Sequence, residues 1–569
     1  MAWLAEHQNA DGGWGDTVDS PSNISTTTLC WAALSTDASA ARLYPAAIEG
    51  TESWLSARAG GVDASRLASA ISDRYGKDRT FSVPILTMCA LSGSFGRRRF
   101  AWGRVPPLPF ELAALPHRLF RWMGLPVVSY AMPALIAIGQ ARHHHRPTRN
   151  PLTSCLRAMV RERTLKVLEA IQPDSGGFIE AIPLTSFVVM SLASIGRADH
   201  AVTRKGAAFL IGAARSDGSW PIDSNLATWL TTLSVNALAE GNAAGSVLSV
   251  DKRAGLIEWL LDQQHRVEHP YTHAAPGGWG WTDLAGGVPD ADDTAGALLA
   301  LRRLATAEKD GGLLTGKIKQ AGEAGVRWLL DLQNRDGGIP TFCKGWGRLP
   351  FDRSCPDLTA HALRAWRAWQ PHVGRELRAR VVHAAARAVR YLVRAQRADG
   401  TWVPLWFGNQ HAPDQENPLY GTTRVLRAGS GVLPASGPGQ AWSRARQRAI
   451  EWVLHAQNKC GGWGGAAGVD ATIEETALAV EALADCCACA ESGHADFGQV
   501  LDALGRGTAW LAERTAGGTQ FDPAPIGLYF AKLWYFECLY PVIFTVAALE
   551  RARRVLAQPA HLPDAVAAG

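Results

Sequence analysis

The feature that most constrains this chain is a short pattern that recurs along nearly all of its 569 residues. A helix-compatible stretch ends in an aromatic–aliphatic pair, a Gln or Ala follows, then Asp-Gly or Gly-Gly, and finally an aromatic residue. Such self-similarity predicts a repeat architecture, in which each unit buries its apolar face only against its neighbours. Copies of the pattern span Trp3–Trp14, Phe209–Trp220, Tyr391–Trp402 and Trp452–Trp463.

Each residue type in the pattern has a local structural reason. A glycine after a helix takes the left-handed conformation that ends the helix. The aromatic residue after the turn covers the helix end, and the Gln amide can bond the free backbone groups there. In one copy, Trp259 and Leu260 lead to Gln263 and, after an insertion, to Gly277 and Trp279. These roles are structural, so the repeats by themselves reveal no chemistry.

A further helical pattern follows each turn, as in residues 294–301, so each repeat is predicted to be a helical hairpin of roughly 45 to 70 residues. Hairpins of this length close most naturally into double-walled barrels and hardly need strands. The chain is also too long for one ordinary core. We therefore predict an all-α fold of two double-walled α/α barrels, an N-terminal barrel at 1–222 and a catalytic barrel at 223–569.

Two stretches interrupt the repeat, about 92–150 and the Pro- and Gly-rich stretch at about 407–440. The second is predicted to be an active-site or surface loop. Within the first, residues 104–128 are apolar, broken by prolines and preceded by arginines at 97–99. An apolar face with Arg and Trp at its edge suits a bilayer interface, although a helix buried between the barrels is the alternative. We expect a membrane-contact segment in this region.

Composition excludes several classes of protein. With 47% hydrophobic and 19% charged residues the chain is globular, and no Lys/Arg stripe with interleaved aromatics suggests a nucleic-acid partner. The ten cysteines lack metal-ligand spacing, so neither a metal nor a cofactor is predicted. No signal peptide and no apolar run of about 20 residues is evident. We expect a peripheral or monotopic protein on the cytoplasmic side of the membrane, with a homodimer left open.

Three carboxylates are concentrated in one short segment. Asp290, Asp292 and Asp293 follow Pro289 and precede an apolar helical stretch. Asp before a helix suits an N-terminal cap and gains from the helix dipole. Three acids so close together also raise one another's pKa, which can keep one of them protonated as an acid. A magnesium site is a further use, and spacing alone leaves acid, metal and cap open.

The Asp-x-Asp-Asp-Thr-Ala segment, set among Gln/Gly/Trp repeats, resembles the squalene–hopene cyclase family of class II terpene cyclases over nearly the whole chain. The resemblance implies that Asp292 protonates a terminal alkene of squalene or a squalene-like polyprene, while Asp290 and Asp293 hold and polarise it. A Thr-Ala-His segment ending at His361 implies that this histidine partners the acid. An alkene is an extremely weak base, so its protonation needs a dry, strong acid, which a neighbouring imidazolium would strengthen.

The resemblance also implies a pocket of aromatic residues that stabilise carbocations by cation–π attraction. The implied pocket residues are Trp229, Trp281, Phe342, Trp406, Tyr420 and Tyr130.

The chain departs from the family's pattern near its C-terminus, where Tyr529 and Phe536 take two pocket positions. Glu474 and Glu475 replace uncharged residues. A carboxylate such as that of Glu475 would hold a cationic intermediate, remove the final proton, or make a polar contact between helices. The chain begins inside the family's first repeats, so the first barrel is expected to be incomplete.

Four other functions fit the sequence less well. A class II cyclase of a shorter prenyl diphosphate would call for a basic cluster and Mg²⁺ near the pocket, and the sequence offers no convincing cluster. A prenyltransferase-like barrel would need a zinc set of Asp, Cys and His. A carbohydrate-active barrel would place its acids among polar residues. A non-catalytic helical scaffold would not need the acid triplet and its histidine partner.

Overall fold

The chain, described here by a computed structural model, folds into helices joined by loops, which confirms the predicted all-α class. Strand-like pairing among the described residues is confined to isolated bridges, such as that between Trp279 and Asp290. The structure describes residues 1–36, 38–76, 78–96, 98–125, 128–240, 247–306, 313–429, 438–488, 497–527 and 532–557.

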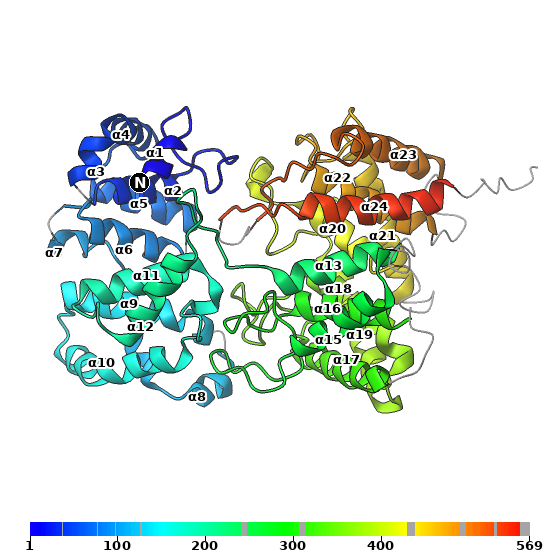
Figure 1. Ribbon diagram of the computed structural model, residues 1–569, viewed down its shortest axis with the longest axis horizontal. Helices are drawn as coiled ribbons and strands as arrows, with labels where there is room; N and C mark the ends of the chain where they lie inside the picture. Colours follow the sequence, from blue (N-terminus) through cyan, green and yellow to red (C-terminus); the bar gives the residue numbers. More distant parts are fainter. Residues whose placement is uncertain are drawn as a thin grey trace, which may run out of the picture.

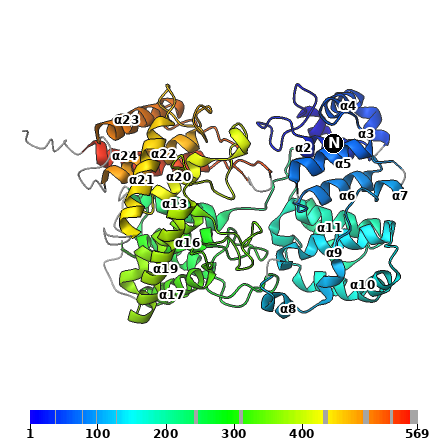
Figure 2. The ribbon, with the colours of Figure 1, turned by 180° about the vertical axis from the view of Figure 1, so that it is seen from behind.

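The helices form two groups that lie side by side, α1 to α12 and α13 to α24 (Figures 1 and 2). Helix α12 (Ala201–Gly212) ends the first group and α13 (Ala227–Glu240) begins the second. An extended segment between them carries the chain across. The exact boundary at residue 222 stays a prediction.

The second group is a double-walled ring. Its inner helices pack each on the next, and α24 packs back on α13, so the ring closes. The inner helices are α13, α16 (Ala291–Thr306), α18 (Pro356–Trp369), α20 (Pro418–Leu426), α22 (Ile473–Ala488) and α24 (Tyr540–Leu556). Each outer helix packs against an inner one and against its outer neighbours. The outer helices are α15 (Val250–Asp262), α17 (Leu313–Leu332), α19 (Arg375–Ala395), α21 (Pro438–His455) and α23 (Phe497–Arg514).

The N-terminal group repeats this layering with fewer helices. Its inner row is α2 (Ile24–Leu34), α6 (Ser82–Ser92), α11 (Ile182–Ser194) and α9 (Val128–His145). The row is covered by α4 (Pro45–Ala59), α5 (Ala64–Tyr75), α10 (Pro151–Ile171) and α12. The short elements are α1 (Ala2–Glu6), α3 (Ala38–Leu43), α7 (Arg98–Ala101), η1 (Phe110–Ala114), α8 (His117–Trp122) and η2 (Phe178–Glu180).

The repeat residues make the contacts predicted for them. The side-chain amide of Gln333 donates to the carbonyl of Gly337 at 2.8 Å and to that of Ala384, on the next outer helix, at 2.9 Å. The indole of Trp402 donates to the carbonyl of Leu392, at the end of the preceding helix, at 2.8 Å. The same pair of amide bonds recurs at Gln8, Gln172, Gln264, Gln396 and Gln457.

In one repeat the predicted glutamine was wrong. Gln264, not Gln263, donates to the carbonyls of Gly277 and Ala321. Gln263 continues the helical backbone beyond α15, and its amide bonds back to the carbonyl of Trp259. Gln263 and Gln264 are adjacent and a long insertion follows them, so the spacing could not show which one makes these bonds. The choice depends on which side chain points toward the turn at the end of α15.

The prediction that residues 407–440 form a loop was also wrong in part, because α20 lies within this stretch and completes the inner ring. The side chain of Asn417 accepts a hydrogen bond from the backbone of Tyr420, and Pro418 occupies the first turn, so the helix starts with a regular cap. Burial between α18 and α22 stabilises a helix this short. Residues 430–437 of the stretch lie outside the described residues.

The inner helices of the second barrel begin near the junction of the two domains. Figure 1 shows α13 and α24 starting on the side that faces the N-terminal domain. The segments that precede α16, α18 and α20 therefore gather at this junction, as does the N-terminal domain's Tyr130, whose hydroxyl donates to the carbonyl of Phe342 at 3.5 Å. The first turns of the inner helices are thus the natural place for a site.

The turn glycines are expected to resist substitution. Gly337 has φ +96°, and a Cβ there would lie 2.4 Å from the carbonyl oxygen of Arg387. Gly337→Ala should therefore destabilise the barrel by about 1–3 kcal/mol. Gly505, inside α23 with open space around it, is the control, and Gly505→Ala should stabilise slightly. Calorimetry of both variants tests this, and equal melting temperatures would contradict it.

Candidate active site

Asp290 is the last residue before α16 and caps the start of this helix. Its carboxylate accepts hydrogen bonds from the backbone N–H groups of Asp292 and Asp293 at 2.8 and 2.9 Å. Its own N–H donates to the carbonyl of Trp279 at 3.0 Å, which ties the segment to the preceding turn. The cap therefore occupies one of the three acids and leaves the side chain of Asp292 available for another partner.

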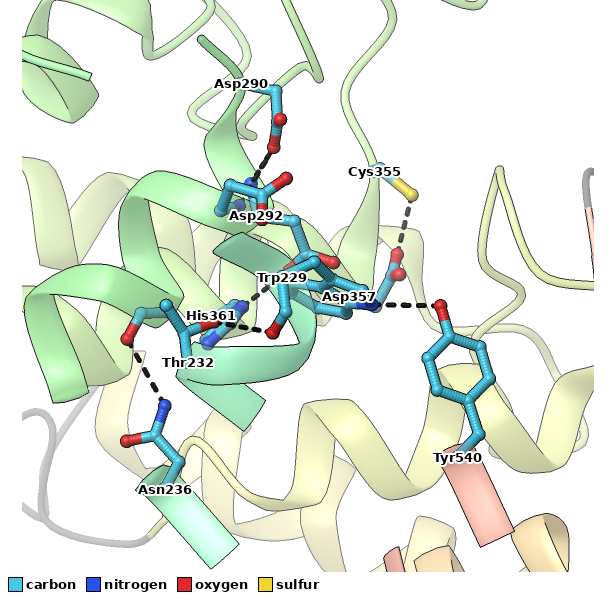
Figure 3. A network of polar contacts seen from close by, with 11 residues as sticks. Trp229, Thr232, Asn236, Asp290, Asp292, Cys355, Asp357, His361 and Tyr540 are labelled. Carbon is cyan, nitrogen blue, oxygen red and sulfur yellow. Dashed lines mark hydrogen bonds and ion pairs between the residues drawn. The ribbon is translucent and has the colours of Figure 1, made fainter. Parts of the chain in front are cut away.

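Asp292, on the inner helix α16, and His361, on the neighbouring inner helix α18, are in direct contact. The Nδ1 atom of His361, on α18, lies 2.5 Å from a carboxyl oxygen of Asp292, on α16 (Figure 3). Burial lowers the pKa of His361, and this effect outweighs the nearby Asp292, which raises it. Burial thus favours a neutral imidazole, in contrast to the imidazolium expected from the sequence. A neutral imidazole that carries its proton on Nδ1 can donate to this oxygen of Asp292, while the acid's own proton lies on the other carboxyl oxygen.

The other two acids of the cluster form a buried pair. Burial raises the pKa of Asp290 to about 7. The pKa of Asp293 is raised well above its ordinary value, first by burial and then by the charge of Asp290. The predicted direction for clustered acids is confirmed for these two residues. Both shifts favour the protonated form of these carboxyl groups, which limits the negative charge beside Asp292.

A fourth carboxyl group was missed by the sequence analysis. Asp357, in the first turn of α18, lines the same cavity as Asp292 and His361. It accepts a hydrogen bond from the thiol of Cys355 at 2.6 Å, and burial raises its pKa to about 6. The signal was present, because an acid directly after Pro356 stands at a helix start just as Asp290 does.

Aromatic side chains form part of the wall of this cavity. Trp229, on α13, and Tyr420, on α20, line it together with Phe544 of α24. The indole N–H of Trp229 donates to the hydroxyl of Tyr540 at 2.9 Å (Figure 3), and Tyr540 stacks on Phe544 with ring centroids 5.3 Å apart. The predicted residues Trp229 and Tyr420 are therefore brought to the acid, and Tyr540 is an additional residue that holds Trp229 in place.

A second aromatic group lies at the domain junction. Phe342 is its centre, with ring centroids 5.1 Å from Tyr130, 6.3 Å from Trp281 and 5.8 Å from Trp406. Phe351, which the sequence analysis missed, completes the group at 5.6 Å from Phe342. Four predicted pocket residues thus form one cluster from distant parts of the chain. Its ring faces and edges can stabilise positive charge.

The remaining predicted residues lie elsewhere. The carboxylate of Glu475 accepts hydrogen bonds from Asn409, Asn417 and Thr472 at 2.8, 2.9 and 3.0 Å, so it anchors the segment before α20 to α22. Phe536 is half-buried in the segment before α24. Tyr529 lies outside the described residues.

Arginines also line the cavity. The cavity is lined by Arg364 of α18, by Arg424 of α20 and by Arg427, which directly follows α20. They come from two motifs that are 60 residues apart, so neither motif by itself looks basic. The prediction that no basic cluster lies near the pocket was wrong, because closure of the ring brings these side chains together.

Buried carboxyl groups in α22 should make stability depend on pH. Burial raises the pKa of Glu474 to about 8, from an ordinary value of 4.5. The folded state then holds a proton that the unfolded state releases, so this stabilisation is complete below pH 4.5 and lost as pH rises through about 8. We expect the melting temperature to fall less from pH 5 to 8 in Glu474→Gln than in the unmodified protein. Each proton that the folded state holds and the unfolded state releases changes the free energy of unfolding by about 1.4 kcal/mol per pH unit, and the variant lacks this proton.

The exposed Glu258 of α15 provides the matched control for this experiment. Glu258→Gln should keep the pH dependence of the unmodified protein. An unchanged slope in Glu474→Gln would show that this carboxyl group does not take up a proton on folding.

Known proteins resemble this chain throughout the second barrel. The squalene-hopene cyclase C-terminal domain family matches residues 224–554, more than half of the chain. A terpene cyclase-glycosyl transferase fusion protein of Humicola fuscoatra is 25% identical over 81% of this chain, which spans only 38% of that protein. A probable squalene–hopene cyclase of Sinorhizobium fredii is 25% identical over 81% of this chain and 74% of its own length. A drimenyl diphosphate synthase of Streptomyces showdoensis is 32% identical over 42% of this chain and 37% of its own length.

The matched residues include the Asp cluster, His361 and the whole wall of the cavity that surrounds them. The closed ring of helices, the capped acid cluster and this match agree with one another. The chain therefore belongs to the squalene–hopene cyclase family of class II terpene cyclases.

Proposed function

We propose that this protein cyclises squalene or a squalene-like polyprene, with Asp292 as the acid that starts the reaction. The observation that carries the proposal is the pair of Asp292 and His361, 2.5 Å apart, in a cavity whose wall includes Trp229, Tyr420 and Phe544. Asp290 and Asp293 are engaged with the helix start and with each other. Asp292 is the acid of the cluster that lines the cavity.

In the proposed reaction the proton on a carboxyl oxygen of Asp292 moves to a terminal carbon of an alkene. A C–H bond forms, the π bond breaks, and a tertiary carbocation results on the neighbouring carbon. His361 stabilises the carboxylate that is left behind. Successive double bonds then attack the cation, and the aromatic cluster around Phe342 lowers the energy of these cations without acting as a nucleophile. Loss of a proton or addition of water ends the sequence, and Asp292 is reprotonated from solvent.

A second candidate is cyclisation of a shorter prenyl diphosphate. Two observations favour it, the arginines that line the cavity and the 32% identity to a drimenyl diphosphate synthase over part of the chain. In this case Asp292 would protonate the terminal alkene in the same way. The two candidates differ in the substrate's head group and chain length, not in the chemistry of the first step.

The deciding experiment incubates purified, detergent-solubilised protein with squalene and, in parallel, with farnesyl and geranylgeranyl diphosphate plus Mg²⁺. Extracts are analysed by gas chromatography and mass spectrometry, after phosphatase treatment for the diphosphates. Cyclic products from squalene alone would support the first candidate. Products from a diphosphate alone would overturn it in favour of the second, and no product from any polyprene by folded protein would remove both.

We further propose that the segment around α8 contacts the membrane from which the polyprene is taken. Large apolar side chains are exposed here, with Trp122 83% exposed, and Arg118 and Arg121 stand among them. The exposed apolar residues are Leu112, Leu115, Leu119, Trp122 and Met123. Apolar and basic residues in one patch suit the bilayer interface. Among the described helices, none has both the length and the apolar character required to cross a membrane.

Vesicle binding tests this proposal. The double variant Leu119→Asp and Trp122→Asp should bind anionic phospholipid vesicles at least about ten-fold more weakly than the unmodified protein, since two apolar side chains leave the interface. Val382→Asp, at an exposed apolar position on α19, should bind normally. Equal binding of all three proteins in co-sedimentation would show that the patch does not reach the membrane.

A further inference from the structure

The cavity beside Asp292 continues toward the C-terminal ends of the inner helices. Arg364 lies three residues beyond His361 on α18, and Arg424 lies four residues beyond Tyr420 on α20. Both side chains line the cavity, as do Arg427 and Glu481. The part of the cavity near Trp229 is thus aromatic, and the part deeper in the barrel is basic.

Only some of these positive charges are balanced. Arg427 forms ion pairs with Glu481 at 2.7 Å and Asp485 at 3.4 Å, and Arg551 pairs with the same two acids. No hydrogen bond or ion pair joins the guanidinium of Arg364 to any residue in the part of the chain that the structure describes. The two acids at this end of the cavity are therefore shared by two arginines, and Arg364 remains without an acid of its own.

Arg424 is held by aromatic rings. Its guanidinium lies 5.2 Å from the ring centroid of Tyr420 and 5.1 Å from that of Phe544. Within the described ranges, no carboxylate comes within 4.0 Å of it. Stacking of this kind fixes the plane of a guanidinium. Although burial opposes it, Tyr420, Glu481 and Asp292 favour the charged form and raise the pKa of Arg424, so it carries its charge inside the cavity.

An unbalanced guanidinium inside a barrel is costly, because burial of a charge without a partner loses its hydration. The pKa of Arg364 is held well below its ordinary value by burial and then by the positive charges of Arg427, Arg303 and Arg551, which outweigh the opposing effect of Glu481. Positive charge thus predominates around Arg364. A bound anion would offset both the lost hydration and this mutual repulsion.

We propose that this end of the cavity is a binding site for a phosphate-class oxyanion, held chiefly by Arg364 and Arg424. The planar fork of a guanidinium matches two oxygens of such an anion. Two arginines without an ion pair of their own among the described residues suit a ligand with at least two negative charges. The anion is either free phosphate or diphosphate, or the head group of an anionic polyprene whose chain folds back so that its terminal alkene reaches Asp292. The site itself does not depend on the proposed cyclisation, but the head-group assignment rests on the proposed function.

Binding of inorganic pyrophosphate to the full chain tests the site. Isothermal titration calorimetry at pH 7.5 and constant ionic strength compares the unmodified protein with Arg364→Gln, Arg424→Gln and the control Arg390→Gln, an exposed arginine of α19. We expect saturable binding to the unmodified protein and the control, and at least ten-fold weaker binding to the two cavity variants. Absence of saturable binding to the unmodified protein, or equal binding to all four proteins, overturns the proposal.

Thermal stability separates a ligand site from a structural role. Without pyrophosphate, Arg364→Gln should melt at the same temperature as the unmodified protein or higher, because an unbalanced charge has been removed. Added pyrophosphate should raise the melting temperature of the unmodified protein and leave that of Arg364→Gln unchanged. A lower melting temperature in Arg364→Gln, with the same response to pyrophosphate as the unmodified protein, contradicts the proposal.

Competition identifies the source of the anion. If the anion is a head group, pyrophosphate will compete with a prenyl diphosphate in the product assay, and Arg364→Gln will raise the KM for that substrate. If it is a free anion, pyrophosphate will bind without changing the KM for squalene. Asp292→Asn should retain pyrophosphate binding, so a failure of the cyclase proposal and a failure of the anion site give different results.

Discussion

Asp292→Asn should lower product formation from the active polyprene by roughly 10³-fold or more, because an amide cannot donate the proton that an alkene requires. Its Oδ1 lies 2.5 Å from Nδ1 of His361, and an asparagine can keep a hydrogen bond of similar length. The fold should therefore be preserved while the acid is lost. Gas chromatography of extracts from matched amounts of both proteins measures the effect.

Asp251→Asn provides the control for this loss of a carboxylate. Asp251 is exposed in the first turn of α15 and outside the cavity. Its replacement should leave product formation unchanged. If Asp292→Asn keeps more than about a tenth of the activity, another group donates the proton, and Asp357, which lines the same cavity, becomes the next residue to replace.

His361→Ala should lower kcat by about 10²-fold to 10³-fold and change KM little. His361 contacts Asp292 and acts through it, so its loss leaves the acid without a partner that holds the carboxyl group and stabilises the carboxylate. Binding of the polyprene depends mainly on the aromatic walls, which this change leaves in place. Steady-state kinetics with the active substrate separates the two constants.

His383→Ala, at an exposed position of α19, is the matched control and should behave as the unmodified protein. A large rise in KM with an unchanged kcat in His361→Ala would place this histidine in substrate binding and not in support of the acid. Circular dichroism of both variants establishes that the barrel is intact before the kinetic constants are compared.

The helical repeats could be predicted from the sequence because their contacts are local. The bond from Gln333 to the carbonyl of Gly337 spans four residues, and the left-handed glycine follows in the same turn. The cap of Asp290 on the N–H groups of Asp292 and Asp293 spans two and three residues. Contacts over such short separations follow from residue type and spacing, so the hairpins and the start of α16 needed no knowledge of the whole fold.

The family resemblance supplied what spacing could not, because it connected His361 with Asp292 across 69 residues of chain. It also named Tyr130, Trp281 and Phe342, which meet although they come from two domains. The resemblance assigned roles to single positions, and Phe351, Asp357 and Tyr540 were not among them. Each of these three contacts one of the predicted residues or lines their cavity.

By itself the sequence determined the all-α class, the repeated hairpin and the capped acid cluster. Only the tertiary structure decided which glutamine closes the insertion before Gly277, that α20 completes the inner ring, and that Arg364 and Arg424 share a cavity with Asp292. The physical reason is the separation over which each contact forms. Helix ends are set by hydrogen bonds between residues that are close in the sequence. The charge and shape of the cavity are set by six inner helices, and the first and last of these, α13 and α24, are far apart in the sequence but pack together.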